Sequence, residues 1–218
     1  MKGKRQQFLR VTLIVTLVAA GGHTGVVAQT ETPEEVVSGA ADLALKELNH
    51  RRDYYEQNPH ELSDLVSSIF LPRFDQTYAA YLILGRYGRS TSAEERVRFT
   101  DALYKYILNR YAHGLLQFTS ERLQILPYQG SPDEERATVR TFVLLNDGRR
   151  IPVNYDLRLS GAGWRVFDIT IEGVSYIRNM RSQFGAEIER NGIESVITRL
   201  QAETATLAVG DADQDDAG

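Results

Sequence analysis

The sequence contains no cysteine among its 218 residues. This absence excludes disulfide bonds, thiol catalysis and zinc sites built on thiolates. It also excludes a lipid anchor attached to a cysteine side chain. A protein of this composition must therefore be held together by its hydrophobic core.

Sequence motifs for metal, nucleotide and hydrolase chemistry are also lacking. The three histidines after residue 28 are His50, His60 and His113, and none lies four residues from another. There is no HExxH, no GxxxxGK[ST], no GxGxxG after a strand and no GxSxG. The segment GRYGRS at 85–90 precedes a helix start, so we interpret it as a turn and not as a phosphate loop. We predict no metal site and no cofactor.

The first 28 residues have the pattern of a secretory signal. Four basic residues within the first ten precede an apolar run over 11–20, which is too short to cross a bilayer as a helix. Small residues then precede a cleavage point, so we predict removal of residues 1–28 after Ala28. The removed segment has no acid, and the full chain already has a net charge of −4. The exported chain is therefore acidic, and we expect no nucleic-acid partner.

The N-terminal half has the signals of several helices. The helix-start signals are TPEE at 32–35, NPHE at 58–61 and SAEE at 92–95. Each begins with a capping residue, has an acid three positions later and precedes apolar residues at helical spacing. The last of these signals begins a long predicted helix that extends toward Phe118. The pattern over residues 74–84 predicts a short helix that ends at Gly85. Two further helical stripes cover 174–188 and 193–200.

Between these helices the apolar pattern has a period of two, which predicts strands. The predicted strands are 121–127, 136–146, 149–160 and 164–172. In the third, Ile151, Val153, Tyr155, Leu157 and Leu159 share one face. Turn signals at 146–149 and 160–164 connect neighbouring strands in a meander. We therefore predict one α+β domain over 29–205, with N- and C-terminal helices on one face of a four-stranded antiparallel sheet, and a disordered acidic tail over 206–218.

Paired acids raise the alternative of an enzyme. Asp168 and Glu172 lie four apart on one strand, so their Cα atoms are about 13 Å apart, wider than the roughly 5–9.5 Å between glycosidase carboxyls. The alternation assigns both acids, and Asp156, to the solvent face of the sheet. An inward-facing, protonated Asp168 would instead favour an isomerase-like site with Tyr155 or Tyr176.

The opposite sheet face is a broad apolar wall, and several helical side chains are candidates to face it. Periodicity alone does not distinguish a solid core from a lined cavity. The candidate lining residues are Phe74, Tyr78, Leu82, Leu103, Ile107, Phe118, Val143, Val153, Tyr155, Leu157, Phe167, Ile169, Ile171, Val174 and Ile177.

The segment GWRVFDITIEGVSYIRNMRSQFGAEIERNGIESVITRL at 163–200 resembles the MlaC family, also called the toluene-tolerance family. The matching positions are Trp164, Phe167, Asp168, Glu172, Gly173, Val174, Ser175, Arg181, Phe184, Gly192 and Ile193. GRYGRSTSAEERVRF at 85–99 resembles the Gly-Arg-Tyr segment of that family. Phe167 departs from the pattern, since relatives often carry tyrosine there.

The resemblance implies a periplasmic phospholipid shuttle, with acyl chains held between the sheet and the helices as cargo. Its partners would be an inner-membrane ABC transporter with an MCE-domain subunit and an outer-membrane lipoprotein complex. Its role would be to maintain the lipid asymmetry of the outer membrane. The resemblance implies no enzyme and no catalytic residue, and we expect a monomer. The segment 172–175 would then be a structural corner. A third alternative, an envelope adaptor with a solid core, predicts no bound lipid.

Basic positions on this acidic chain are candidates for docking to the membrane complexes. They are Arg86, Arg89, Arg149 and Arg150.

Overall fold

The computed structural model describes residues 31–112, 123–130, 134–145 and 148–210. The predicted signal peptide with its cleavage point, His113 and Phe118 lie outside the described residues. Among the described helices, none is long and apolar enough to cross a membrane.

The N-terminal half is helical, as predicted. Its elements are α1 (Pro33–Gln57), α2 (Pro59–Phe70), η1 (Leu71–Arg73), α3 (Gln76–Leu84), η2 (Gly85–Arg89) and α4 (Ala93–Tyr111). Thr32 and Ser92 form the predicted capping boxes, each accepting a hydrogen bond from the backbone N–H three residues later. Asn58 does not cap α2; its side chain donates to the Tyr54 carbonyl at 2.7 Å and so closes the end of α1.

The sheet is an antiparallel meander in the order β1-β2-β3-β4-β5. Its strands are β1 (Leu123–Ile125), β2 (Arg136–Leu144), β3 (Arg150–Ser160), β4 (Gly163–Ile171) and β5 (Val174–Ser175). The fifth strand was not predicted. It forms because Glu172 and Gly173 both have positive φ, at 50° and 83°, and turn the chain back onto β4.

A β-bulge in β4 changes which side chains share a face. Leu157 pairs with Val166 and Asp156 pairs with Asp168, so Phe167 is an extra residue without a partner on β3. Val166 therefore joins Ile169 on the inner face, although strict alternation would place them on opposite faces.

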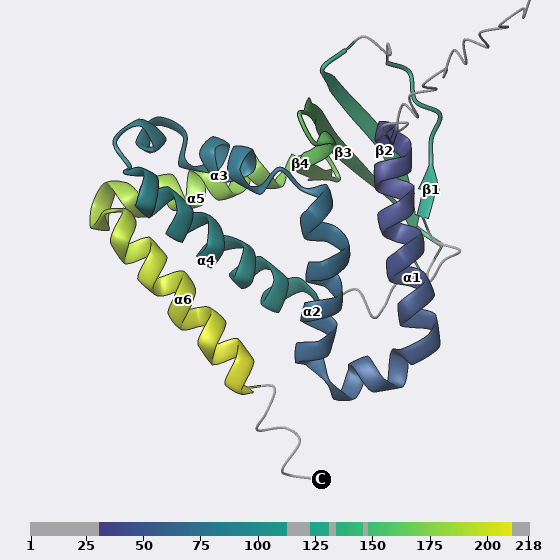
Figure 1. Ribbon diagram of the computed structural model, residues 1–218, viewed down its shortest axis with the longest axis horizontal. Coiled ribbons are helices and arrows are strands. Elements are labelled where there is room, and N and C mark those ends of the chain that lie inside the picture. The colour runs from purple at the N-terminus through teal and green to yellow at the C-terminus, as the bar shows by residue number, and fades with distance from the viewer. Residues whose placement is uncertain (1–30, 113–122, 131–133, 146–147, 211–218) are drawn as a thin grey trace, which may run out of the picture.

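The helices cover the inner face of the sheet, as predicted. α1 stands alongside the strands (Figure 1), and Val36 and Val37 pack with Val139, Leu157 and Trp164. A second group is formed by α3, α4 and the C-terminal helices α5 (Tyr176–Asn191) and α6 (Ile193–Gly210).

The core of this second group is mostly aliphatic and contains two phenylalanines. The rings of Phe99 and Phe184 meet edge to face at 5.9 Å. In Figure 1, α6 lies beside α4, and it continues past the predicted domain end at 205.

Candidate functional site

A cavity of about 390 Å³ lies between the inner face of the sheet and helices α1, α2, α4 and α5. Its size falls within the roughly 300–1,000 Å³ typical of small-molecule sites. The predicted residues that line it are Phe74, Leu103, Ile107, Val143, Val153, Tyr155, Phe167, Ile169, Ile171 and Ile177.

Other predicted residues lie elsewhere. Leu157 is fully buried in the solid core beneath α1, and Leu82 is half-buried on α3 without reaching the cavity. The Tyr78 hydroxyl accepts a hydrogen bond from Arg136 at 2.6 Å, and its ring meets Phe167 at 5.3 Å. Val174 is 57% exposed, so the prediction that it walls the cavity is wrong.

Sequence reasoning missed the contribution of α1, whose inner side supplies one cavity wall. The residues concerned are Val36, Val37, Ala40, Ala41, Ala44, Leu45 and Leu48. Their helical periodicity was visible in the sequence, but periodicity does not identify the surface that a helical face covers. Ala40 and Ala44 line the cavity and also pack against Ile69 of α2.

The cavity wall contains few polar groups, among them the phenols of Tyr104, Tyr155 and Tyr176. Burial raises the pKa of Tyr155 to about 12. Burial and, to a smaller degree, the negative charge of Asp75 raise the pKa of Tyr104. A phenol of ordinary pKa, about 10, is already neutral at physiological pH, and burial strengthens this preference. The hydroxyls of Tyr104 and Tyr155 can therefore act as neutral hydrogen-bond donors.

Asp168 is buried, contrary to the prediction that it faces solvent. It is 9% exposed, because the turn at 172–173 brings β5 and the start of α5 against β4. Its Oδ1 accepts from the Ile177 N–H at 3.0 Å and its Oδ2 from the Ser175 hydroxyl at 2.5 Å. The Ser175 Oγ in turn accepts from the Arg178 N–H at 3.1 Å. Asp168 and Ser175 thus cap the N-terminus of α5 together.

The corner at 172–175 consists of the turn at 172–173 and the short strand β5, whose last residue, Ser175, is the N-cap of α5. Both carboxylate oxygens of Asp168 are engaged by the start of α5, which leaves this acid poorly placed to act as a base on a ligand. Asp156, on the outer sheet face, accepts from the Thr138 hydroxyl at 2.6 Å. No cluster of three potential metal ligands occurs in the part of the chain that the structure describes.

A second, polar cleft of about 380 Å³ lies between η2 and α5. Arg86 contacts Glu189 across it at 2.9 Å and also donates to the Tyr87 hydroxyl at 2.5 Å. Gly85 has a φ of 54°, and a Cβ placed there would lie 2.9 Å from Cζ of Arg181. This segment needs glycine both for its backbone conformation and for the close approach of the guanidinium.

The four predicted docking arginines occupy two separate regions. Arg86 and Arg89 are exposed on η2, beside the polar cleft. Arg149 and Arg150 are exposed where β3 begins, at the end of the β2–β3 hairpin.

An α+β domain with an apolar cavity between its sheet and its helices has the architecture of a small-molecule-binding protein. Residues 39–202 match the family of the MlaC protein, so the chain belongs to the MlaC family.

Two curated relatives cover most of this chain. One is the toluene tolerance protein ttg2D of Pseudomonas putida, 28% identical over 180 residues, which are 82% of each chain. The other is the intermembrane phospholipid transport system binding protein MlaC of Haemophilus influenzae, 26% identical over 173 residues, 78% of this chain and 81% of the relative.

The fold also matches a solved structure. It is that of a phospholipid-binding protein from Ralstonia solanacearum in complex with a phospholipid, with a TM-score of 0.74 and 24% identity over 82% of this chain and 99% of the other.

Proposed function

We propose that this protein is a phospholipid carrier that holds acyl chains in its apolar cavity and moves lipid between the two membranes of the cell envelope. The observation that carries the proposal is the apolar cavity of about 390 Å³ between the sheet and the helices. Membership of the MlaC family supports it, as does the name of the Haemophilus influenzae relative, an intermembrane phospholipid transport system binding protein.

The physical requirement for such a carrier is enclosure of the chains. Each CH₂ group is worth about 0.8 kcal/mol on transfer from water, so a 16-carbon chain costs on the order of 12 kcal/mol to expose. The walls of the cavity, such as Val153, Ile169 and Ile177, supply the apolar contacts that avoid this cost. The function needs no catalytic residue, and MlaC proteins are lipid-binding transport proteins, not enzymes.

The carrier works in the periplasm. Removal of residues 1–28 after Ala28 releases a domain whose last helix, α6, ends at Gly210, followed by an acidic tail. It receives or delivers lipid at an inner-membrane ABC transporter with an MCE-domain subunit and at an outer-membrane lipoprotein complex. This traffic maintains the lipid asymmetry of the outer membrane.

The arginines at the surface serve as docking points for these complexes. The η2 pair, Arg86 and Arg89, and the hairpin pair, Arg149 and Arg150, lie in different regions and suit two different contacts. Exposed cations on an acidic protein increase the rate of association with acidic partner surfaces.

The test is a variant that fills the cavity. Ala44 is 7% exposed and lines the cavity from α1, whereas Ala93 is exposed at the start of α4. We expect delipidated wild-type protein and Ala93→Trp to take up a fluorescent phosphatidylglycerol from detergent micelles in stoichiometric amounts. Ala44→Trp should bind at least about tenfold more weakly, because losing two buried CH₂ contacts already costs about 1.6 kcal/mol.

Gel filtration separates bound from free lipid, and circular dichroism shows that each variant is folded. Unchanged uptake by a folded Ala44→Trp protein would contradict the location of the acyl chains in this cavity.

A further inference from the structure

Arg73, the last residue of η1, is the one cation that lines the apolar cavity in the described part of the chain. Its Nη1 donates to the Ile69 carbonyl at 2.7 Å. Its Nε is buried and has no hydrogen-bond partner among the described residues. A guanidinium has five N–H donors, so most of the donors of Arg73 have no hydrogen-bond acceptor among the described residues.

The acids near this segment are already engaged by other groups. Asp75 accepts from the Tyr78 N–H at 3.0 Å and from Arg158 Nε at 2.5 Å. Asp168 is the one acid among the described cavity-lining residues, and its carboxylate accepts hydrogen bonds from Ser175 and Ile177 at the start of α5. A buried donor of a charged group without a partner is costly, because it loses its hydration without compensation. A ligand that brings an anion into the cavity would remove this cost.

The backbone holds Arg73 in a fixed place at the cavity wall. The neighbouring Phe74 forms a bridge with Val166 at the β4 bulge, and the Asp75 N–H donates to the Val166 carbonyl at 2.8 Å. Phe70 and Phe74, on either side of Arg73 in sequence, also line the cavity. The guanidinium thus lies beside apolar side chains. A phospholipid has the matching arrangement, since its charged phosphate lies next to its apolar acyl chains.

We propose that Arg73 binds the phosphate of the lipid cargo, while the acyl chains fill the apolar part of the cavity. This assignment rests on the function proposed above and adds the chemical group that the site recognises. The planar guanidinium suits bidentate contact with phosphate oxygens. Because every glycerophospholipid contains this phosphate, Arg73 recognises the class of lipid and leaves the headgroup beyond the phosphate unspecified.

The hydrogen bond from Arg73 to Ile69 also satisfies a carbonyl at the end of α2, and loss of this bond would lower stability. A purely structural role of this kind changes the free energy of unfolding but not the choice between a lipid with a phosphate and one without. The decisive measurement is therefore selectivity at equal acyl chains.

The experiment is a competition between dipalmitoyl phosphatidylglycerol and dipalmitoylglycerol at equal concentration in mixed micelles, followed by native mass spectrometry of delipidated, reloaded protein. We expect wild-type protein to prefer the phospholipid at least about tenfold, the size of one charge-assisted hydrogen bond. Arg73→Gln should bring the ratio near one, and Arg73→Lys should keep part of the preference.

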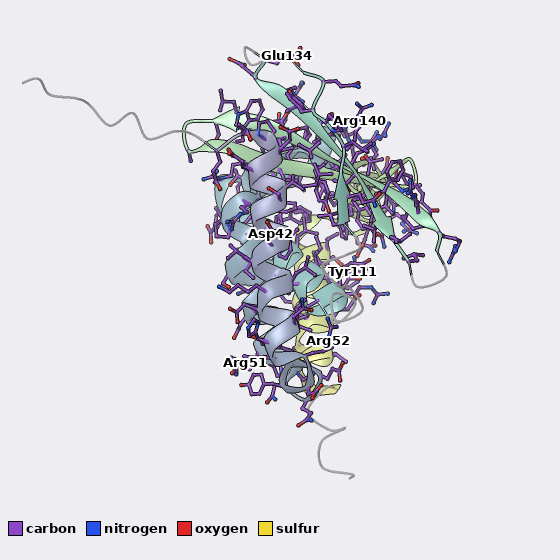
Figure 2. All side chains as sticks on the ribbon, turned by 90° about the vertical axis from the view of Figure 1, so that its right-hand side faces the viewer. Asp42, Arg51, Arg52, Tyr111, Glu134 and Arg140 are labelled. Atoms are coloured by element: carbon purple, nitrogen blue, oxygen red, sulfur yellow. The ribbon has the colours of Figure 1, made fainter. Side chains whose placement is uncertain are left out.

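The matched control is Arg140→Gln. Arg140 lies on β2 opposite Asn154, on the outer sheet face, and Figure 2 shows it on the sheet, far from Arg51 and Arg52 at the lower end of α1. This variant should keep the wild-type ratio.

A wild-type preference that Arg73→Gln retains would overturn the assignment of Arg73 and leave the carrier function standing. Equal loading of the two lipids by wild-type protein would overturn the assignment even if no Arg73 variant folds. Displacement of phosphatidylglycerol by palmitate at equal chain concentration would mean that the cation binds a fatty-acid carboxylate, which also overturns it. Failure of wild-type protein to load either diacyl lipid would instead contradict the proposed function.

Discussion

Replacing Asp168 by alanine should destabilise the fold through the start of α5. The substitution removes the acceptor of two hydrogen bonds, from the Ile177 N–H and from the Ser175 hydroxyl. The site is buried, since Asp168 is 9% and Ser175 is 4% exposed, so water does not readily replace the lost acceptor. The Ser175 hydroxyl also loses the contact that orients it toward the Arg178 N–H.

The expected loss follows from these contacts. A hydrogen bond to a charged group contributes about 1.5–3 kcal/mol, and a negative charge at a helix N-terminus adds roughly 0.3–1 kcal/mol. The contacts share one carboxylate and are not additive, so we expect Asp168→Ala to lower the free energy of unfolding by about 3 kcal/mol. Asp168→Asn keeps an acceptor for the Ile177 N–H and should cost about 1 kcal/mol.

Urea unfolding of delipidated protein measures these losses, because a bound ligand would add its own stabilisation. The melting temperature of Asp168→Ala should fall by about 6–12 °C for a domain of this size. Asp156→Ala is the matched control, since Asp156 makes an exposed hydrogen bond on the outer sheet face and should cost under about 1 kcal/mol. Equal stability of the two alanine variants would refute the capping role of Asp168.

Three further predictions follow from other contacts. The hydrogen bond from Arg199 holds the pKa of Glu187 below its usual value, so the stability from this pair is complete above about pH 4.5 and is lost as the pH falls through the lowered pKa. Between pH 5 and pH 3 in urea titrations, Glu187→Gln should therefore lose less stability than wild-type protein; an equal loss would contradict the pairing. Gly85→Ala should destabilise by about 1–3 kcal/mol in thermal unfolding, because residue 85 has a positive φ and its Cβ would meet the Arg181 guanidinium, and a neutral effect would contradict that geometry. Val174→Ser should change neither the free energy of unfolding nor that of lipid binding by more than about 0.5 kcal/mol, since Val174 is 57% exposed. Reduced lipid uptake by this variant would indicate that Val174 lines the cavity after all.

Much of the fold could be predicted because its signals are local. The capping boxes at Thr32 and Ser92 depend on residues three positions apart. The strands β2 and β3 have a regular alternation. The fifth strand was missed because it is only two residues long and depends on pairing with β4. The bulge at Phe167 arises from the register with β3, which no pattern within β4 specifies.

The cavity was less predictable than the fold. Val153 and Leu157 share a face of one strand, yet Val153 lines the cavity and Leu157 lies in the solid core. Leu157 packs against Val36 and Val37 of α1, and which helical residues lie opposite a strand residue is a property of the packed structure. The sequence did not identify Arg73 as a binding residue, because a single arginine in a 3₁₀ turn is common and its role depends on its surroundings in the fold.

Native mass spectrometry can show directly whether the protein carries phospholipid. The protein should be purified without detergent from the periplasm of its host, and its lipids extracted from the same sample. We expect a stoichiometric adduct with the mass of a phospholipid, matched by phospholipid in the extract. A mass equal to that of the polypeptide alone, with no uptake from vesicles in the presence of the membrane partners, would contradict the carrier function.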